Sequence, residues 1–256
     1  MLREIKALRT VNNRHVVLLQ SVLYNKQSVG IVLDLAQCDL RAVIKSFRPG
    51  AMAIPTCKLY LRQLLDGLRY LHDTVGLVHL DIKPENLLLE ADHPSSATDC
   101  RLRPSSYSVD IFAAGVVLAE MMGPVPWVDK YFDPWMCFDE MLEFLGCPHG
   151  ELWPGADKLP GLWQGQEGLG DLPIHLAKKG RIRFPPRSRA MQKLPCKVTG
   201  DGTEDLIALR NKILVLDPEL RPRAREVLKE PRLNNDPKPA TYGDLAPLQE
   251  KSLSTR

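Results

Sequence analysis

An eight-residue stretch, His79-Leu80-Asp81-Ile82-Lys83-Pro84-Glu85-Asn86, places an acid, a cation and an amide on one short segment. An aspartate such as Asp81 can orient a hydroxyl group and accept its proton, and Lys83 can meet negative charge on a reacting group. Asn86 offers a carbonyl oxygen, a ligand type that Mg²⁺ prefers. Together these groups suit transfer of a phosphoryl group to a hydroxyl. The alternative is a surface turn that matches by chance, which the apolar runs 77–78 and 87–89 on either side disfavour.

Several elements that could position this segment are predicted from hydrophobic spacing. Leucines recur at helical intervals over about residues 56–73, so we expect a helix whose polar face, Arg62, Gln63, Asp66 and Arg69, meets water. The apolar run 111–122 predicts a buried central helix, and residues 2–9, 138–145 and 206–216 predict a helix end and two further helices. Two strands are expected at 15–19 and 29–33, which are rich in β-branched residues, with a turn at Asn25-Lys26. Pro and Gly crowd residues 148–195, which predicts long loops.

The overall composition excludes several classes of protein. The chain has 256 residues and a formal net charge of +3, so charge alone suggests neither a nucleic-acid binder nor a membrane-surface protein. The longest apolar run, Ile111 to Ala119, is too short to span a bilayer, and the first residues lack the apolar core of a signal peptide. The six cysteines form no C-x-x-C pair. We therefore expect an intracellular protein of the nucleus or cytoplasm, with reduced cysteines, that contacts neither nucleic acid nor membrane.

Five further segments, in the same order, resemble one family. The segment 79–86 resembles the catalytic loop H-R-D-x-K-x-x-N of protein kinases, and its Lys-Pro-Glu-Asn ending is similar to the serine/threonine branch. The others resemble parts of the cyclin-dependent-kinase-like kinases: Arg3-Glu4-Ile5, the end of the cyclin-facing helix; 31–40, the hinge; 110–115, the start of the central helix; 145–148 with 153–155, the insert of this branch; and 217–222, the D-P-x-x-R-P motif. The resemblance covers residues 3 to about 233.

This resemblance implies an α+β protein-kinase-like fold and the transfer of the ATP γ-phosphoryl group to a Ser or Thr of a protein substrate, with a possible cyclin-like partner. Asp81 would orient the hydroxyl, Lys83 would neutralise transition-state charge, and Asn86 with Asp99 would hold Mg²⁺. Adenine would lie between the hinge and Leu88, and Asp110 would brace the catalytic loop. The implied nucleotide-site residues are Glu4, which would pair with the ATP-anchoring lysine, Leu33, Asp34 and Ala36 of the hinge, Asp39 at the ribose, and Leu88.

The sequence departs from the family at parts that do the chemistry. No G-x-G-x-x-G loop or V-A-I-K lysine precedes Glu4, and Asp99-Cys100-Arg101 stands where the family has D-F-G. Asp99 is therefore either a metal ligand or an ordinary loop acid. Only residues 102–109 separate these three residues from Asp110, which leaves no room for an activation loop. We expect a truncated kinase that binds ATP·Mg²⁺ weakly or not at all; the alternative is a pseudokinase that acts as a binding or scaffold protein.

Two residues relate to the missing activation loop in opposite ways. Leu80 replaces the arginine that, in the family, meets a phosphorylated activation loop. The loss of this arginine is therefore consistent with the loss of the activation loop. Arg221 would pair in the family with the glutamate of an A-P-E segment that this sequence lacks, so it is expected to be poorly satisfied. In domain terms we expect a remnant of the smaller kinase lobe and the hinge over 1–36, the larger lobe over 37–233 and a flexible tail over 234–256.

Two other groups of residues have competing interpretations. His72 and His79 adjoin apolar stripes and show no metal-ligand spacing, so we expect structural roles for both. The basic residues between Lys178 and Arg189 could form a nuclear import or docking patch, but a solvated loop is favoured.

Overall fold

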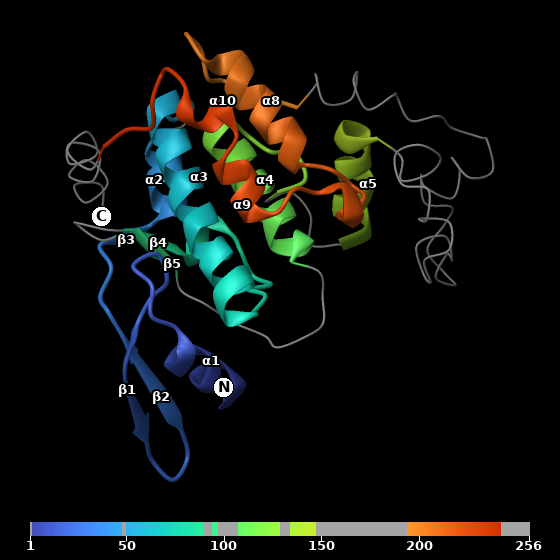
Figure 1. The fold of residues 1–256 in the computed structure, drawn as a ribbon. Helices are drawn as coiled ribbons and strands as arrows, with labels where there is room; N and C mark the ends of the chain where they lie inside the picture. The colour runs from blue at the N-terminus through green and yellow to red at the C-terminus, as the bar shows by residue number, and fades with distance from the viewer. Residues whose placement is uncertain are drawn as a thin grey trace, which may run out of the picture.

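The computed structural model describes residues 2–47, 50–89, 94–96, 107–128, 134–146 and 194–241. The α-helices are α1 (Leu2–Thr10), α2 (Leu40–Ser46), α3 (Ile54–Arg69), α4 (Ser108–Met122), α5 (Pro134–Leu145), α8 (Thr203–Ile213), α9 (Ala224–Leu228) and α10 (Pro231–Asn234). The strands are β1 (Leu19–Tyr24), β2 (Val29–Leu33), β3 (Cys38–Asp39), β4 (Leu87–Leu89) and β5 (Pro94–Ser96). Figure 1 shows α1 and the β1–β2 hairpin at one end and the helical part, with α3 and α4 at its centre, at the other. This is the α+β class that the sequence predicts.

The leucine stripe forms α3, the longest helix described. Pro55 lies in its first turn, and the helix continues through a π-helical turn, Tyr70–Val75, that ends at Gly76 with a φ of 76°. Leu61 and Leu65 are fully buried, as the pattern predicts. The expectation for Gln63 is wrong: this side chain is only 6% exposed, because neighbouring elements cover α3 on more than its leucine face.

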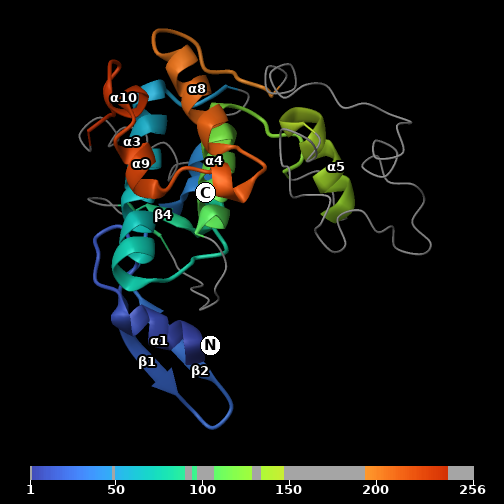
Figure 2. The same ribbon diagram turned by 45° about the vertical axis from the view of Figure 1, so that its right-hand side comes forward.

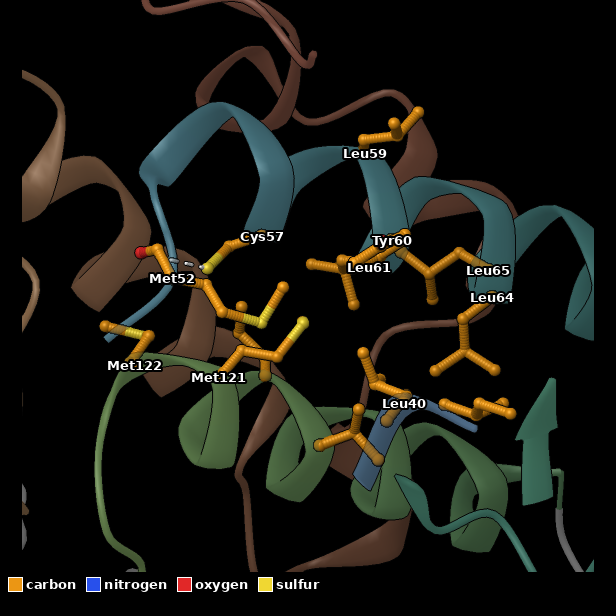
Figure 3. Close-up of a cluster of buried hydrophobic side chains, with 14 of the residues drawn as sticks. Leu40, Met52, Cys57, Leu59, Tyr60, Leu61, Leu64, Leu65, Met121 and Met122 are labelled. Carbon is orange, nitrogen blue, oxygen red and sulfur yellow. Dashed lines mark hydrogen bonds between the residues drawn. The ribbon is translucent and has the colours of Figure 1, made fainter. Parts of the chain in front are cut away.

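The predicted central helix is α4, and it is buried on nearly every side. Eleven of its fifteen residues are buried, which confirms the prediction from its apolar run. A side chain at Gly115 would come within 2.7 Å of Ile213, so the missing Cβ lets α8 pack closely against α4. Figure 3 shows Met121 and Met122 of α4 facing the α3 side of the core. One helix of this packed pair, α4, also carries Asp110, which accepts from the backbone N–H groups of His79 and Leu80.

The hairpin differs from the prediction in its first strand. β1 and β2 pair antiparallel, with Val22 opposite Ile31, but β1 begins at Leu19, where the predicted strand was to end. His15, Val16 and Val17 are buried instead, and the carbonyl oxygen of His15 lies 3.1 Å from the Cβ position of Gly67 on α3. Burial against the helix therefore outweighs the strand propensity of these residues.

The segment that follows α10 contacts α3. Lys58, fully buried on α3, donates from Nζ to the carbonyl oxygens of Asn235 and Pro237, each at 3.0 Å, and Ala240 N–H donates to Pro55 O. Asn235, Pro237 and Ala240 are thus bonded to α3, and the flexible tail over 234–256 stays a prediction. The two-lobe division at residue 36 stays a prediction. Asp99, the basic residues 178–189, the insert residues 153–155 and nearly all of the predicted loop region 148–195 lie outside the described residues.

Candidate active site

The predicted catalytic loop, residues 79–86, brings Asp81, Lys83 and Asn86 into direct contact. Lys83 is extended, with φ −158° and ψ 158°, as expected before a proline, and Pro84–Asn86 then form one 3₁₀ turn that leads into β4. This turn returns Asn86 to Asp81: its Nδ2 donates to the Asp81 carboxylate at 2.7 Å and to the Asp81 carbonyl oxygen at 2.8 Å. Lys83 Nζ lies 3.0 Å from the same carboxylate oxygen, Oδ2. The three predicted catalytic residues therefore form one cluster.

The cluster favours the ionised form of Asp81. Partial burial alone would raise the pKa of Asp81, but hydrogen bonds from Lys83 and Asn86 outweigh it and hold the pKa below its ordinary value. The side chains of Asp81 and Lys83 are 43% and 48% exposed, so both can be reached from solution. An accessible, ionised carboxylate beside a cation can accept a hydrogen bond from a hydroxyl group and orient it.

Asp110, at the start of α4, braces this loop from behind. Its fully buried carboxylate accepts hydrogen bonds from the backbone N–H groups of His79 at 2.7 Å and Leu80 at 2.8 Å, and His72 Nε2 lies 2.8 Å from Oδ2. Leu80 has a φ of +70°, a left-handed backbone conformation that residues other than glycine rarely adopt. The buried carboxylate thus holds the backbone in a conformation that aligns two N–H groups. His72 and His79 are accordingly structural, as expected.

The predicted hinge lies beside the strand that follows the loop. β3 pairs antiparallel with β4, with Asp39 directly opposite Leu88, and Gln37 N–H donates to Leu89 O at 2.9 Å. Asp39 also caps α2, because its Oδ1 accepts from Ala42 N–H at 2.8 Å. The structure therefore brings together two of the residues expected at the nucleotide.

The other residues expected at the nucleotide lie at the end of β2, between β2 and β3, and on α1. Leu33 ends β2, and Ala36 follows it between β2 and β3; both are half-buried. Asp34 is exposed, and its side chain accepts a hydrogen bond from Gln20 at 2.8 Å. Glu4 is half-buried on α1.

An ion-pair triplet that the sequence analysis missed ties the loop to α2 and α4. Arg41 on α2 pairs with Glu85 of the catalytic loop at 2.7 Å and with Glu120 of α4. Burial would lower the pKa of Arg41, but the two carboxylates outweigh this and raise it, while Arg41 in turn holds the pKa of Glu85 below its ordinary value. The sequence holds one signal of this triplet: Glu120 is a carboxylate at the end of an apolar helix, and a buried carboxylate needs a partner.

Comparison with known proteins finds protein kinases among those similar in sequence to this chain. A sequence profile of the protein kinase domain matches residues 1–102. Cyclin-dependent kinase 7 of Xenopus laevis is 27% identical in an alignment that covers 98% of this chain and 72% of that protein. Cyclin-dependent kinase 15 of Danio rerio is 27% identical over 94% of this chain and 60% of its own length. Over most of its length the chain is thus similar to cyclin-dependent kinases. A further kinase, serine/threonine-protein kinase STK11 of Rattus norvegicus, is 35% identical over 45% of this chain and 34% of its own length.

The surroundings of Arg221 contradict the expectation drawn for it from the sequence. Its guanidinium donates to Val215 O at 2.6 Å, Leu216 O at 2.7 Å and Ser108 O at 3.2 Å, and it lies 4.6 Å from the centre of the Phe112 ring. Burial lowers its pKa to about 10, opposed by nearby Asp217. The prediction that Arg221 is poorly satisfied is wrong, because its planar fork of donors is met by backbone carbonyl oxygens, two after the end of α8 and one at the start of α4.

The described residues hold no ready-made metal cluster and no membrane span. Within the described ranges, no three His, Cys, Asp or Glu side chains form a group that could hold a metal ion. Asp99, the second expected Mg²⁺ ligand, lies outside those ranges. No helix in the described part of the chain is long and apolar enough to cross a bilayer.

Proposed function

We propose that the segment 79–86 is the catalytic loop of a serine/threonine protein kinase, built to transfer the ATP γ-phosphoryl group to a protein hydroxyl. The observation that carries this proposal is the contact of Lys83 and Asn86 with one carboxylate oxygen of Asp81, on a loop braced by Asp110. A chance surface turn has no reason to be fixed to a buried carboxylate. The cyclin-dependent kinases among its relatives give the class of reaction.

Each residue of the cluster has a part in this chemistry. Asp81, kept ionised by its neighbours, orients the substrate hydroxyl and accepts its hydrogen bond. Lys83, half exposed beside it, is placed to neutralise negative charge on the transferred group. The triplet around Arg41 positions Glu85 and with it the turn that carries Asn86. Fixed positions and charges of this kind supply most of the rate in phosphoryl transfer.

The donor atoms of the loop fit Mg²⁺. Because Asn86 uses its amide nitrogen to bind Asp81, its amide oxygen is the atom suited to a hard cation, next to an ionised carboxylate. Asn86 and Asp99 would hold the ion, and the hinge residues with Leu88 would hold the adenine. When bound, ATP supplies the phosphoryl group and Mg²⁺ supplies the charge that neutralises it.

A second candidate function is that of a binding protein without turnover. It is favoured by Leu80 in place of the family's arginine and by the eight residues, 102–109, that stand where an activation segment would lie. Without a platform for a peptide, the hydroxyl is not delivered to Asp81. We therefore propose that the 256-residue chain does not phosphorylate peptides, although its loop is of the kinase type.

Nucleotide titration tests the proposed loop function. We expect ATP·Mg²⁺ to bind with a dissociation constant of about 1 mM, or −4 kcal/mol, because the hinge residues and the amide oxygen of Asn86 supply its contacts. Ligand-observed NMR should show this binding, and Asn86→Ala should abolish it. Asn25→Ala is the matched control, since the side chain of Asn25 also takes part in two hydrogen bonds, in the β1–β2 turn. Binding that is unchanged by Asn86→Ala would remove the proposed role and leave the binding-protein function.

A further inference from the structure

The β1–β2 hairpin keeps its apolar side chains close to solvent. None of residues 18–37 is buried, and Leu23 and Tyr24 near its tip are 61% and 63% exposed. Figure 1 and Figure 2 both show the hairpin extending past α1, away from the helical part. In the part of the chain that the structure describes, β2 pairs with β1 alone. A two-stranded sheet of this kind is only marginally stable in water, so a further strand would stabilise it.

The backbone of β2 directs hydrogen-bonding groups away from β1. At the turn, Asn25 N–H donates to Ser28 O at 3.0 Å, so these two residues form a hydrogen-bonded pair. Bonded and non-bonded pairs alternate along an antiparallel ladder, and the register therefore makes Val22 and Ile31 a non-bonded pair. The N–H and C=O groups of Ile31 consequently point away from β1, and those of Val29 do the same. An added strand can bond directly to these groups.

The two edges of the hairpin differ. β1 has an irregular register between Leu19 and Ser21, where Gln20 has no residue opposite it. A bulge of this kind bends a strand and hinders the addition of another. β2 pairs in unbroken register over Val29–Leu33, and residues 27–33 include neither a charge nor a proline. Natural edge strands use such residues to block pairing, so β2 has the open edge.

The charges at the two ends of β2 complement each other. When two β2 strands run antiparallel about a two-fold axis at Gly30, Lys26 of each copy lies opposite Asp34 of the other. Both side chains are exposed, and among the described residues neither has an ion-pair partner, because Asp34 accepts its hydrogen bond from the neutral amide of Gln20. An axis one residue further along the strand separates the two charges. Exposed ion pairs contribute little free energy, but they select one register.

We propose that two copies of the chain associate through the outer edges of β2, to give a four-stranded sheet in the order β1–β2–β2–β1. Val29 of each copy faces Ile31 of the other, so backbone hydrogen bonds and the packing of β-branched side chains join the copies. One strand serves both copies, so the assembly closes at two. The bulged β1 edges lie on the outside of the sheet and limit its growth.

Sedimentation equilibrium of the 256-residue chain tests the association. The average mass should rise from the 28.8 kDa of one chain towards twice this value as the concentration is raised to about 1 mM, because a single strand edge buries less than a standard interface. Ile31→Pro removes an outward N–H group without touching the bonds to β1. It should weaken the association at least about tenfold, since a dimer loses two hydrogen bonds.

Val22→Pro is the matched control for this variant. It removes the outward N–H group directly across the hairpin from Ile31 and should leave the association unchanged. An equal loss in the two variants would overturn the proposal. A mass that stays that of one chain would also overturn it and would leave this edge to a strand of another protein.

Charge reversal tests the register without altering the strand. Lys26→Asp and Asp34→Lys each place like charges opposite each other, so each variant alone should associate about three- to tenfold more weakly than the unaltered chain. In an equal mixture, a mixed dimer of the two variants has both opposite-charge pairs again, so the mixture should regain the association of the unaltered chain. A mixture that associates no better than either variant alone would overturn the proposal.

Discussion

Replacing Asp110 by asparagine should destabilise the protein strongly, although the two side chains have almost the same shape. The buried carboxylate accepts from His79 N–H and Leu80 N–H and contacts His72. Asparagine keeps one oxygen but turns an NH₂ group toward one of these partners. At least one charge-assisted hydrogen bond is lost, worth about 1.5–3 kcal/mol, and one buried donor is left without an acceptor, at about 1–3 kcal/mol. We expect the free energy of unfolding to fall by about 3–5 kcal/mol.

Urea unfolding followed by tryptophan fluorescence measures this loss. Trp127 is 8% exposed and lies in one buried apolar cluster with Ala119 of α4, so it reports on the helical part that contains α4. The control is Asp73→Asn, which makes the same chemical change at an exposed position on the turn after α3 and should alter stability by less than about 0.5 kcal/mol. A loss below about 1 kcal/mol for Asp110→Asn would refute the view that this carboxylate holds the catalytic loop.

Three further predictions concern other parts of the molecule. Arg221→Met should lower the free energy of unfolding by about 2–4 kcal/mol, because it leaves three carbonyl oxygens without their hydrogen-bond donor. Arg225 is exposed, so Arg225→Met should change the free energy of unfolding little in the same urea experiment. The pKa of Asp81 is lowered on folding, so its contribution to stability is present above about pH 4 and is lost as the pH falls through the folded-state pKa. In Asp81→Asn the free energy of unfolding should therefore fall less steeply as the pH is lowered through this range. An unchanged dependence on pH would count against the Lys83 and Asn86 contacts. Transfer of radioactive phosphate to Ser/Thr peptides should be undetectable, and transfer that disappears in Asp81→Ala would contradict this.

The catalytic cluster could be predicted because its geometry is local. Asp81, Lys83 and Asn86 lie within six residues, and one extended residue before a proline followed by one 3₁₀ turn is enough to bring them together. The brace by Asp110 lies 30 residues away and followed from the family resemblance rather than from spacing. The main helices were predicted as well, because their apolar faces repeat with the period of a helix.

Features that depend on long-range contacts were missed or wrong. The pairing of Arg41 with Glu85 and Glu120 joins residues 44 and 79 positions apart, and nothing in the local sequence specifies it. Arg221 was expected to need a carboxylate, but it is satisfied by the carbonyl oxygens of Val215 and Leu216, which lie between α8 and the 3₁₀ turn Pro218–Leu220, and only the fold sets their positions. Val16 and Val17 have strand propensity, yet burial decides their conformation.

The most direct measurement of the kinase-type loop is the position of a paramagnetic ion bound with nucleotide. Mn²⁺ takes oxygen ligands much as Mg²⁺ does, and its unpaired electrons broaden nearby amide resonances. With ATP present, Mn²⁺ should broaden the amide signals of Asp81 to Asn86 first, and this selective broadening should disappear in Asn86→Ala. Broadening that is strongest elsewhere, or that persists in the variant, would contradict the assignment of this loop to phosphoryl transfer.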